Sequence, residues 1–279
     1  MRRFLLKFLP PSWLKKTPII HVVRLEGAIM SGKSLRGGNL NMQVLEPVLT
    51  KAFRKGVAAV ALQINCPGGS PVQSALISER IRGLSAEHKV PVYAFCEDVA
   101  ASGGYWLACA ADEIFADENS IMGSIGVISM GFGFPQALEK LGIERRVYTA
   151  GEAKSTNDPF KPEKPEDVKR LQELLEEMHQ SFKALVRERR RDKLKGEDKE
   201  LFSGAYWTGA KSKELGLVDG LGHMRAIMKA KFGEKAVFRK IPLQQGWGLR
   251  RFGFAQLTDI PEAALESLEA RSLWQRFGL

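Results

Sequence analysis

The sequence predicts an α/β fold in which a parallel sheet is flanked by helices. Short runs rich in β-branched residues alternate with helical patterns, and glycine- or proline-containing loops separate them. Right-handed crossovers of this kind place successive strands in one parallel sheet. With 279 residues, of which 44% are hydrophobic and 27% charged, the chain has enough apolar material for a large buried core.

The predicted elements follow one another from residue 18 onward. Strands are predicted where apolar, mostly β-branched residues run together, at 19–25, 57–65, 90–96, 113–116, 125–129 and 145–149. Helices are predicted from apolar spacing of three and four residues, at 44–53, 72–84, 105–111, 135–141 and 165–191. The longest helix has Pro165 at its start, acids in its first turn and basic residues at its end, as the helix dipole favours. A last helix is predicted after Pro261.

We predict three parts along the chain: a basic apolar arm at 1–17, a folded domain at 18–232 and a C-terminal extension at 233–279. The apolar run in the arm is too short to span a bilayer and has no small-residue cleavage site after it. Two interpretations of the arm stay open, an anchor at an anionic membrane surface and a solvated tail. We therefore expect a cytoplasmic protein, with peripheral contact to the inner membrane through the arm as the alternative.

The net charge of +10 is concentrated in the segments 1–25, 187–195 and 225–251. A nucleic-acid-binding domain typically spreads its basic residues over one face, so we expect no nucleic-acid partner. The three cysteines (Cys66, Cys96 and Cys109) match no zinc spacing and cannot all pair. We expect them to be small buried thiols and expect neither a metal nor another cofactor.

Two glycine-rich turns carry the candidate chemistry. Residues 65–70 read Asn-Cys-Pro-Gly-Gly-Ser and residues 100–105 read Ala-Ala-Ser-Gly-Gly-Tyr, and each turn follows a predicted strand or its extension. Ligands bind beyond the carboxyl ends of strands in open α/β sheets. Ser102 is either a helix cap or a nucleophile. An acyl-transfer site needs a nucleophile next to donors for an oxyanion, and two adjacent glycine turns can supply both.

A nucleophilic serine also needs a base. None of the four histidines has a sequence position that identifies it as this base. They are His21, His88, His179 and His223. Lysine can serve when burial lowers its pKa from ~10.4 toward neutrality. Lys154 is the candidate, because it lies in a loop of small residues at 151–156.

These motifs resemble those of peptidase family S49, the signal peptide peptidase A and SohB-like serine proteases. The resemblance covers about residues 22–222 and depends on ordered blocks at 64–70, 100–112, 123–127, 151–160, and 207–209 with 215–219. It implies a ClpP/crotonase-like fold with repeated β-β-α units.

The resemblance also implies a role for each site residue. Ser102 corresponds to the nucleophile, Lys154 to the general base, and Ser124 to a hydroxyl that positions the lysine ammonium. The backbone N–H groups of Gly69 and Ser102 correspond to the oxyanion hole. The chain departs from the family pattern at Cys66, where serine is frequent, and at Glu152, where another lysine is frequent.

The resulting hypothesis is a serine endopeptidase that uses a Ser-Lys dyad and needs neither ATP nor metal. Family resemblance implies peptide substrates, such as signal-peptide remnants or apolar membrane-protein fragments. Longer family members carry two copies of the unit, with serine and lysine from different copies. Because this chain has one copy, we expect a closed homo-oligomeric ring, with an octamer as one candidate, in which Lys154 reaches Ser102 of a neighbour.

Two alternatives belong to other functional classes. A crotonase-like acyl-CoA enzyme shares the fold and the oxyanion chemistry but does not need Ser102 or Lys154. A non-catalytic, membrane-associated scaffold is favoured only by the charged ends of the chain. Failure of a serine-directed fluorophosphonate probe to label the protein would favour these alternatives over the peptidase.

Overall fold

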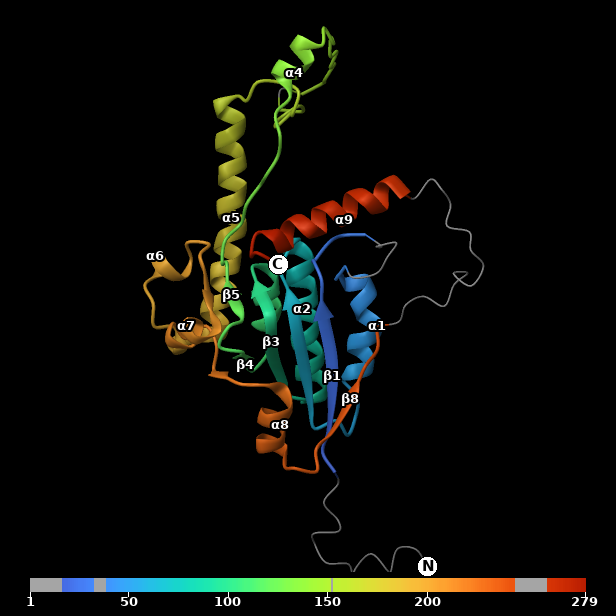
Figure 1. The fold of residues 1–279 in the computed structure, drawn as a ribbon, viewed down its shortest axis with the longest axis vertical. Helices are drawn as coiled ribbons and strands as arrows, with labels where there is room; N and C mark the ends of the chain where they lie inside the picture. Colours follow the sequence, from blue (N-terminus) through green and yellow to red (C-terminus); the bar gives the residue numbers. More distant parts are fainter. Residues whose placement is uncertain (1–16, 33–38, 152, 244–259) are drawn as a thin grey trace, which may run out of the picture.

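A sheet of eight strands forms the centre of the part that the computed structural model describes, which comprises residues 17–32, 39–151, 153–243 and 260–279 (Figure 1). The main strand order is β6-β5-β3-β2-β1-β8, while β4 pairs with β3 and β7 pairs with β4. All pairs are parallel except β5 with β6. The predicted α/β fold with a largely parallel sheet is therefore confirmed.

The strands are short and mostly buried, as expected for a parallel sheet covered by helices. They are β1 (Ile19–Glu26), β2 (Ala59–Cys66), β3 (Val92–Ala101), β4 (Glu113–Ala116), β5 (Ile121–Gly123), β6 (Tyr206–Thr208), β7 (Gly220–Leu221) and β8 (Val237–Lys240). Strand β3 has two successive neighbours on one side: its first half pairs with β4 and its last three residues pair with β5.

The helices surround the sheet and extend beyond it (Figure 1). They are α1 (Met42–Ala52), α2 (Pro71–His88), α3 (Gly103–Ala108), α4 (Pro135–Lys140), α5 (Pro165–Arg190), α6 (Asp198–Leu201), α7 (Gly209–Glu214), α8 (Met224–Phe232) and α9 (Ile260–Gln275), with a 3-10 turn at Arg191–Lys193. Asn41 and Ser70 cap α1 and α2, because their side-chain oxygens accept hydrogen bonds from Val44 and Gln73 amides.

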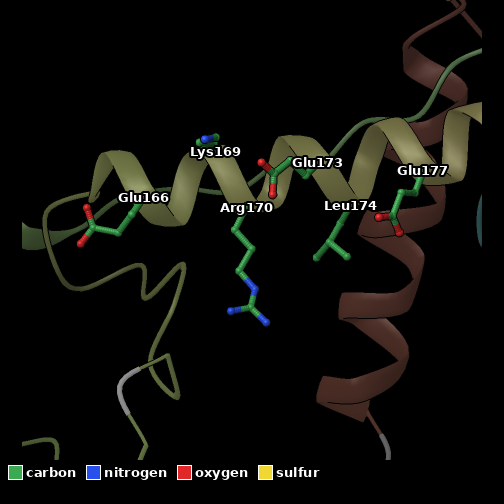
Figure 2. A pocket seen from close by; sticks show the side chains of 6 residues that line it. All are labelled: Glu166, Lys169, Arg170, Glu173, Leu174 and Glu177. Carbon is green, nitrogen blue, oxygen red and sulfur yellow. The ribbon is translucent and has the colours of Figure 1, made fainter.

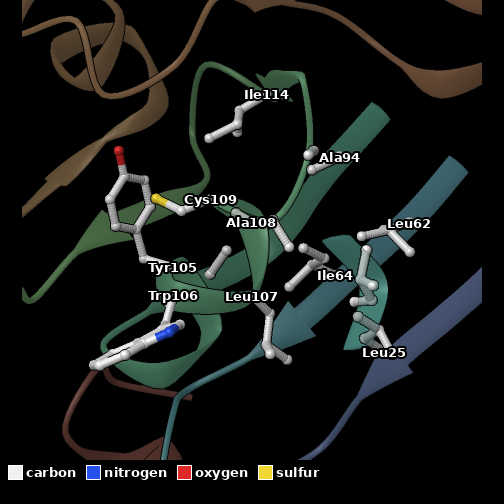
Figure 3. Packing of buried hydrophobic residues seen from close by; sticks show 14 of the residues in the cluster. Leu25, Leu62, Ile64, Ala94, Tyr105, Trp106, Leu107, Ala108, Cys109 and Ile114 are labelled. Carbon is white, nitrogen blue, oxygen red and sulfur yellow. The ribbon is translucent and has the colours of Figure 1, made fainter. Parts of the chain in front are cut away.

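Side chains of β1 and β2 point alternately to the two faces of the sheet. Val23, Leu25, Val60, Leu62 and Ile64 face the larger core, together with buried residues of α1, α2 and α3. Ile20, Val22, Ala59 and Ala61 face a smaller core that includes Met228 of α8. Every residue of α3 is buried, and Figure 3 shows its side chains among those of neighbouring strands. The apolar helix that starts at the second glycine turn is thus fixed inside the larger core.

The structure corrects two predicted strands. Residues 125–129 and 145–149 do not form strands; the strand in this region is β5, which ends before residue 125. After β5 the chain leaves the sheet and enters an arm, made of residues 126–164, that projects with the start of α5 away from the body (Figure 1). Short apolar runs in extended backbone resemble strands in sequence even where no neighbouring strand is available.

The structure also places both described parts of the predicted C-terminal extension against the domain. Strand β8 pairs with β1, from Ile19 with Val237 to Val22 with Lys240. Phe277, at the end of the chain, is buried against Val99 of β3. The predicted boundary at residue 232 therefore falls too early, because it removes an edge strand from the sheet.

The predicted N-terminal arm, 1–17, lies outside the described residues except for its last position. Along the described ranges, no helix combines the length and the apolar character needed to cross a membrane.

A buried ion pair joins α5 to the loop before β7. The side chain of Arg190 is only 2% exposed and donates to the Asp219 carboxylate at 2.7 Å and to the Gly216 carbonyl at 2.9 Å. Asp219 also accepts from the amide of Ile114 in β4 at 2.8 Å. Burial opposes ionisation of Asp219, but the hydrogen bonds from Arg190 and Lys193 hold its pKa below the ordinary value.

We expect Asp219→Asn to lower the free energy of unfolding by about 3 kcal/mol, because it leaves the Arg190 charge buried without its counterion. A carboxyl group with a lowered folded-state pKa stabilises the fold above its unfolded pKa of ~3.9, and this contribution is lost as the pH falls through the folded value. Urea unfolding should therefore show a wild-type advantage at pH 7 that shrinks below pH ~4.

The matched control is Asp198→Asn, which removes the partner of Arg187 at an exposed position. Its unfolding midpoint should stay close to wild type, since exposed ion pairs contribute little. Equal losses in the two variants would contradict a structural role for the Arg190–Asp219 pair.

Candidate active site

Ser102 occupies a strained turn between β3 and α3. Its backbone angles are φ 53° and ψ −123°, and positive φ is uncommon for a residue with a Cβ atom. The side chain is half-buried and makes no capping hydrogen bond to α3. Ser102 occupies the N-cap position of α3, but its hydroxyl does not cap the helix. A sharp turn from strand to helix is a known way to present a nucleophilic hydroxyl above a sheet.

The first glycine turn packs directly against Ser102. A Cβ atom built on Gly68 would lie 2.8 Å from the Cβ of Ser102 and 2.8 Å from the amide nitrogen of Gly103. A Cβ on Gly69 would lie 2.0 Å from the carbonyl oxygen of Ile29, and one on Gly104 would lie 2.2 Å from that of Cys66. Glycine is therefore required where these backbones meet.

Asn65 holds the irregular end of β2 next to β3. The pairing of β2 with β3 shifts register between Ile64 and Cys66. The Asn65 side chain donates to the Asp98 carboxylate at 2.7 Å and accepts from the Val99 amide at 3.2 Å. These bonds join the two strands at the point where the ladder is interrupted, immediately before both glycine turns.

Strand pairing brings Ser124 beside Ser102. Ala101 of β3 is in register with Gly123 of β5, so the two serines each follow a paired residue. Ser124 is buried and also has a positive φ of 52°. Its amide donates to the Ala205 carbonyl at 2.7 Å, which fixes its backbone against the segment before β6.

The backbone hydrogen bonds differ from the predicted oxyanion hole at one position. The amide of Ser102 donates to the Gly123 carbonyl at 2.8 Å and continues the ladder between β3 and β5. This amide is therefore already hydrogen-bonded and cannot also donate to an oxyanion without breaking that bond. Within the part of the chain that the structure describes, the amides of Gly69 and Gly103 donate no backbone hydrogen bond, and both residues line the hollow described next.

A hollow of about 570 Å³ opens above these residues. Gly69, Ser102, Gly103 and Ser124 contribute to its wall, and Trp106 and Phe182 add apolar surface. The rings of Trp106 and Phe182 stack with centroids 4.7 Å apart, which fixes α5 against α3 next to the hollow. The structure thus brings the predicted serines and Gly69 to one cavity.

Lys154 lies elsewhere in the chain. It is exposed, and it belongs to the connection between α4 and α5, which is part of the arm. It is not among the described residues that line the hollow. A single chain therefore assembles the predicted nucleophile and Ser124 but does not bring the predicted base to them.

His179 is a residue of the hollow that sequence reasoning left unassigned. Its Nε2 atom lies 3.1 Å from the carbonyl oxygen of Ile125, one residue after Ser124. A signal was present in the sequence, because His179 precedes the buried Phe182 and Val186 by three and seven residues and so shares the inner face of α5. This hydrogen bond gives the histidine a positioning role for the segment after β5.

The three cysteines are free and buried, as predicted. Burial raises the pKa of the Cys66 and Cys109 thiols to about 12 and raises that of Cys96 as well. Because the thiolate is the reactive form, Cys66 is a poor nucleophile despite its place in the first glycine turn. In the described ranges, no group of three or more histidine, cysteine or acidic side chains could hold a metal ion.

A second hollow, of about 460 Å³, lies along α5 (Figure 2). All its lining residues belong to this helix: Glu166, Lys169, Arg170, Glu173, Leu174 and Glu177. Acidic and basic side chains of one helix line it, and none of its lining residues is a nucleophile. We therefore place the candidate nucleophilic chemistry at the hollow beside Ser102.

Comparison with known proteins identifies the class to which this fold and site belong. The model of peptidase family S49 matches residues 85–237, which include Ser102, Ser124 and Lys154. The chain belongs to peptidase family S49.

Among individual relatives, a protein of Brucella abortus named Na(+)/H(+) antiporter NhaA is 46% identical over 300 residues, which cover all of this chain and 41% of that protein. The chloroplastic serine protease SPPA of Arabidopsis thaliana is 34% identical over 68% of this chain and 28% of its own length. Protease 4 of Haemophilus influenzae is 35% identical over 76% of this chain and 34% of its own length. The chain spans less than half the length of each.

Two solved structures share the fold. Both are mutants of the 1510-N membrane-bound stomatin-specific protease, and one of them is in complex with a substrate peptide. They are 14% and 13% identical to this chain, with TM-scores of 0.50 and 0.51, and the matches cover 81% and 89% of this chain and 99% and 98% of theirs.

We expect Gly69→Ala to lower both the thermal stability and the reactivity of Ser102. The new methyl group would meet the Ile29 carbonyl at 2.0 Å, at a φ of +139° that disfavours alanine, and the turn must move away from Ser102. Differential scanning calorimetry and labelling by a fluorophosphonate probe measure the two effects.

Gly83→Ala provides the matched control. Gly83 lies within α2 and has open space around its Cβ position, so alanine should stabilise this helix by up to about 1 kcal/mol and leave labelling unchanged. If Gly69→Ala behaved like Gly83→Ala, the close approach of the turn would have no importance for the site.

Proposed function

We propose that this chain is a serine endopeptidase in which Ser102 is the nucleophile and Lys154 of a neighbouring copy is the general base. The observation that carries the proposal is the strained Ser102 turn, whose hydroxyl makes no capping bond and lines a hollow beside two glycine amides. Membership of peptidase family S49 and likeness to a protein named serine protease give further support.

In the proposed reaction, Ser102 Oγ attacks a peptide carbonyl carbon while the neutral amine of Lys154 takes its proton. The carbonyl oxygen becomes an oxyanion and accepts hydrogen bonds from the amides of Gly69 and Gly103. The C–N bond then breaks, and the lysine returns the proton to the leaving amine. Water attacks the resulting serine ester by the same route and releases the acid. The Ser124 hydroxyl would orient the lysine ammonium.

A base from another copy is proposed because the hollow contains no lysine among its described residues. Its histidine, His179, is bonded to the Ile125 carbonyl, and no hydrogen bond within the described ranges joins it to Ser102. Lys154 is carried instead by an arm whose large apolar side chains face solvent, with Phe132 82% and Tyr148 90% exposed. Apolar surface of this kind is typical of an interface, so we propose that arms pack together in a ring, with an octamer as one candidate.

We propose peptide substrates of apolar character, such as signal-peptide remnants or fragments of membrane proteins. The apolar lining of the hollow and the substrate peptide bound to the stomatin-specific protease support a peptide. We also propose contact of segment 1–17 with an inner-membrane surface, which would bring the protein to the membrane from which such fragments come.

Ser102→Ala should abolish labelling by a fluorophosphonate probe and hydrolysis of an unfolded fluorogenic peptide, while the thermal midpoint stays near that of the wild type. The serine makes no capping bond, so the fold loses little when the hydroxyl is removed. Mass spectrometry of the wild-type adduct should place the probe on Ser102. An unlabelled but folded wild-type protein would favour a crotonase-like acyl-CoA enzyme or a non-catalytic scaffold.

Mixing two inactive variants, Ser102→Ala and Lys154→Ala, should restore part of the activity once subunits exchange. Some interfaces then combine an intact serine with an intact lysine. Lys154→Arg should not restore activity, because a guanidinium does not deprotonate in the working pH range. If native mass spectrometry verifies exchange and hydrolysis does not return, the base is not supplied by a neighbouring Lys154.

A further inference from the structure

Helix α9 lies across the end of the sheet at which β1, β2 and β3 finish (Figure 1). Its last residues are held there by a small apolar cluster. Phe277 is buried against Val99 and Ala101 of β3, Trp274 packs beside it, and the rings of Phe277 and Tyr206 meet edge to face with centroids 5.3 Å apart. The end of the helix is therefore fixed to the strand that carries Ser102.

This anchoring places one face of α9 at the hollow above Ser102. Glu269 and Leu273 lie four residues apart on one side of α9 and line the hollow together with Arg276, which directly follows the helix. Leu273 is partly exposed and apolar. Glu269 and Arg276 carry charged ends that can remain hydrated beside it. Leu273 is thus the apolar group that α9 offers to an occupant of the hollow.

The remainder of the hollow offers apolar surface with which Leu273 can act. Trp106 and Phe182 lie among its lining residues, as do Ile128 and Met130 from the start of the arm. Trp106 and Phe182 are buried, whereas Ile128 and Met130 are more than half exposed, so the apolar surface left to cover belongs mainly to Ile128 and Met130. An apolar substrate side chain would bind more favourably by removing this apolar surface from water.

We infer that α9 forms one wall of the substrate cleft and that Leu273 limits the size of the apolar side chain accepted next to Ser102. The inference depends on the proposed peptidase function, because it assigns the side chain of an acyl-donor residue to this hollow. The segment that sequence reasoning separated as a C-terminal extension becomes a specificity-determining part of the site. Leu273 acts by steric contact and takes no part in the bond-making steps.

The test uses peptide boronic acids, which bind a nucleophilic serine reversibly and so place their last side chain beside it. Three analogues that differ only in this side chain, Ala, Leu or Trp, are titrated into the full-length protein by calorimetry. We expect the wild type to prefer Leu over Trp. Leu273→Ala should shift the Trp-to-Leu affinity ratio upward by about tenfold, as expected for a few methylene groups of space. Leu273→Trp should weaken binding of the Leu analogue and spare the Ala analogue.

The matched control is Leu268→Ala, on the same helix, where the side chain is 65% exposed and is not among those that line the hollow. Its affinity ratios should equal those of the wild type. Binding of all three analogues with ratios unchanged by both Leu273 variants would overturn the inference and leave the peptidase proposal standing. If no analogue binds the folded wild type, the proposed nucleophile fails and the inference fails with it.

Discussion

The close approach of two backbone turns, one after β2 and one after β3, controls the geometry of the whole site. Glycine makes that approach possible, because side chains at Gly68, Gly69 and Gly104 would overlap neighbouring backbone atoms. The approach also depends on strand order: β2 and β3 are adjacent and parallel, so their following turns emerge at one edge. The buried α3 then fixes the second turn from inside the core. The position of Ser102 is consequently a property of the sheet as much as of its own loop.

Apolar patterns predicted most of the fold, because buried residues recur at regular intervals along its longer strands and helices. Strands β1 and β2 and helices α1, α2 and α5 were all identifiable from runs or spacings of apolar residues. Of the two wrong strands, 125–129 lies where the chain leaves the sheet and 145–149 lies within the arm, where apolar residues such as Ile128 and Tyr148 are exposed. The boundary at 232 failed for a related reason, since the four-residue edge strand β8 is too short to show a period and depends on pairing with β1.

The sequence predicted the residues of the glycine turns at the site but not the hydrogen-bonding state of each amide. Ser102 and Gly69 were found because each lies in a conspicuous glycine turn. The amide of Ser102 was assigned to the oxyanion hole because the resemblance to family S49 implies it, whereas the pairing of β3 with β5 uses this amide in the ladder. The position of Leu273 at the hollow could not be predicted from the sequence, since it lies 171 positions after Ser102 and is brought there by the packing of Trp274 and Phe277 against β3.

The projecting arm would make the activity of a newly synthesised subunit depend on assembly. If the arm brings the base to a neighbour, each subunit folds with a prepared serine that has nothing to activate it. Such a chain would be inactive while it is dilute and would gain activity only at concentrations that sustain assembly. Assembly would then control proteolytic activity. The exposed aromatic side chains of the arm would determine the protein concentration at which subunits assemble and become active.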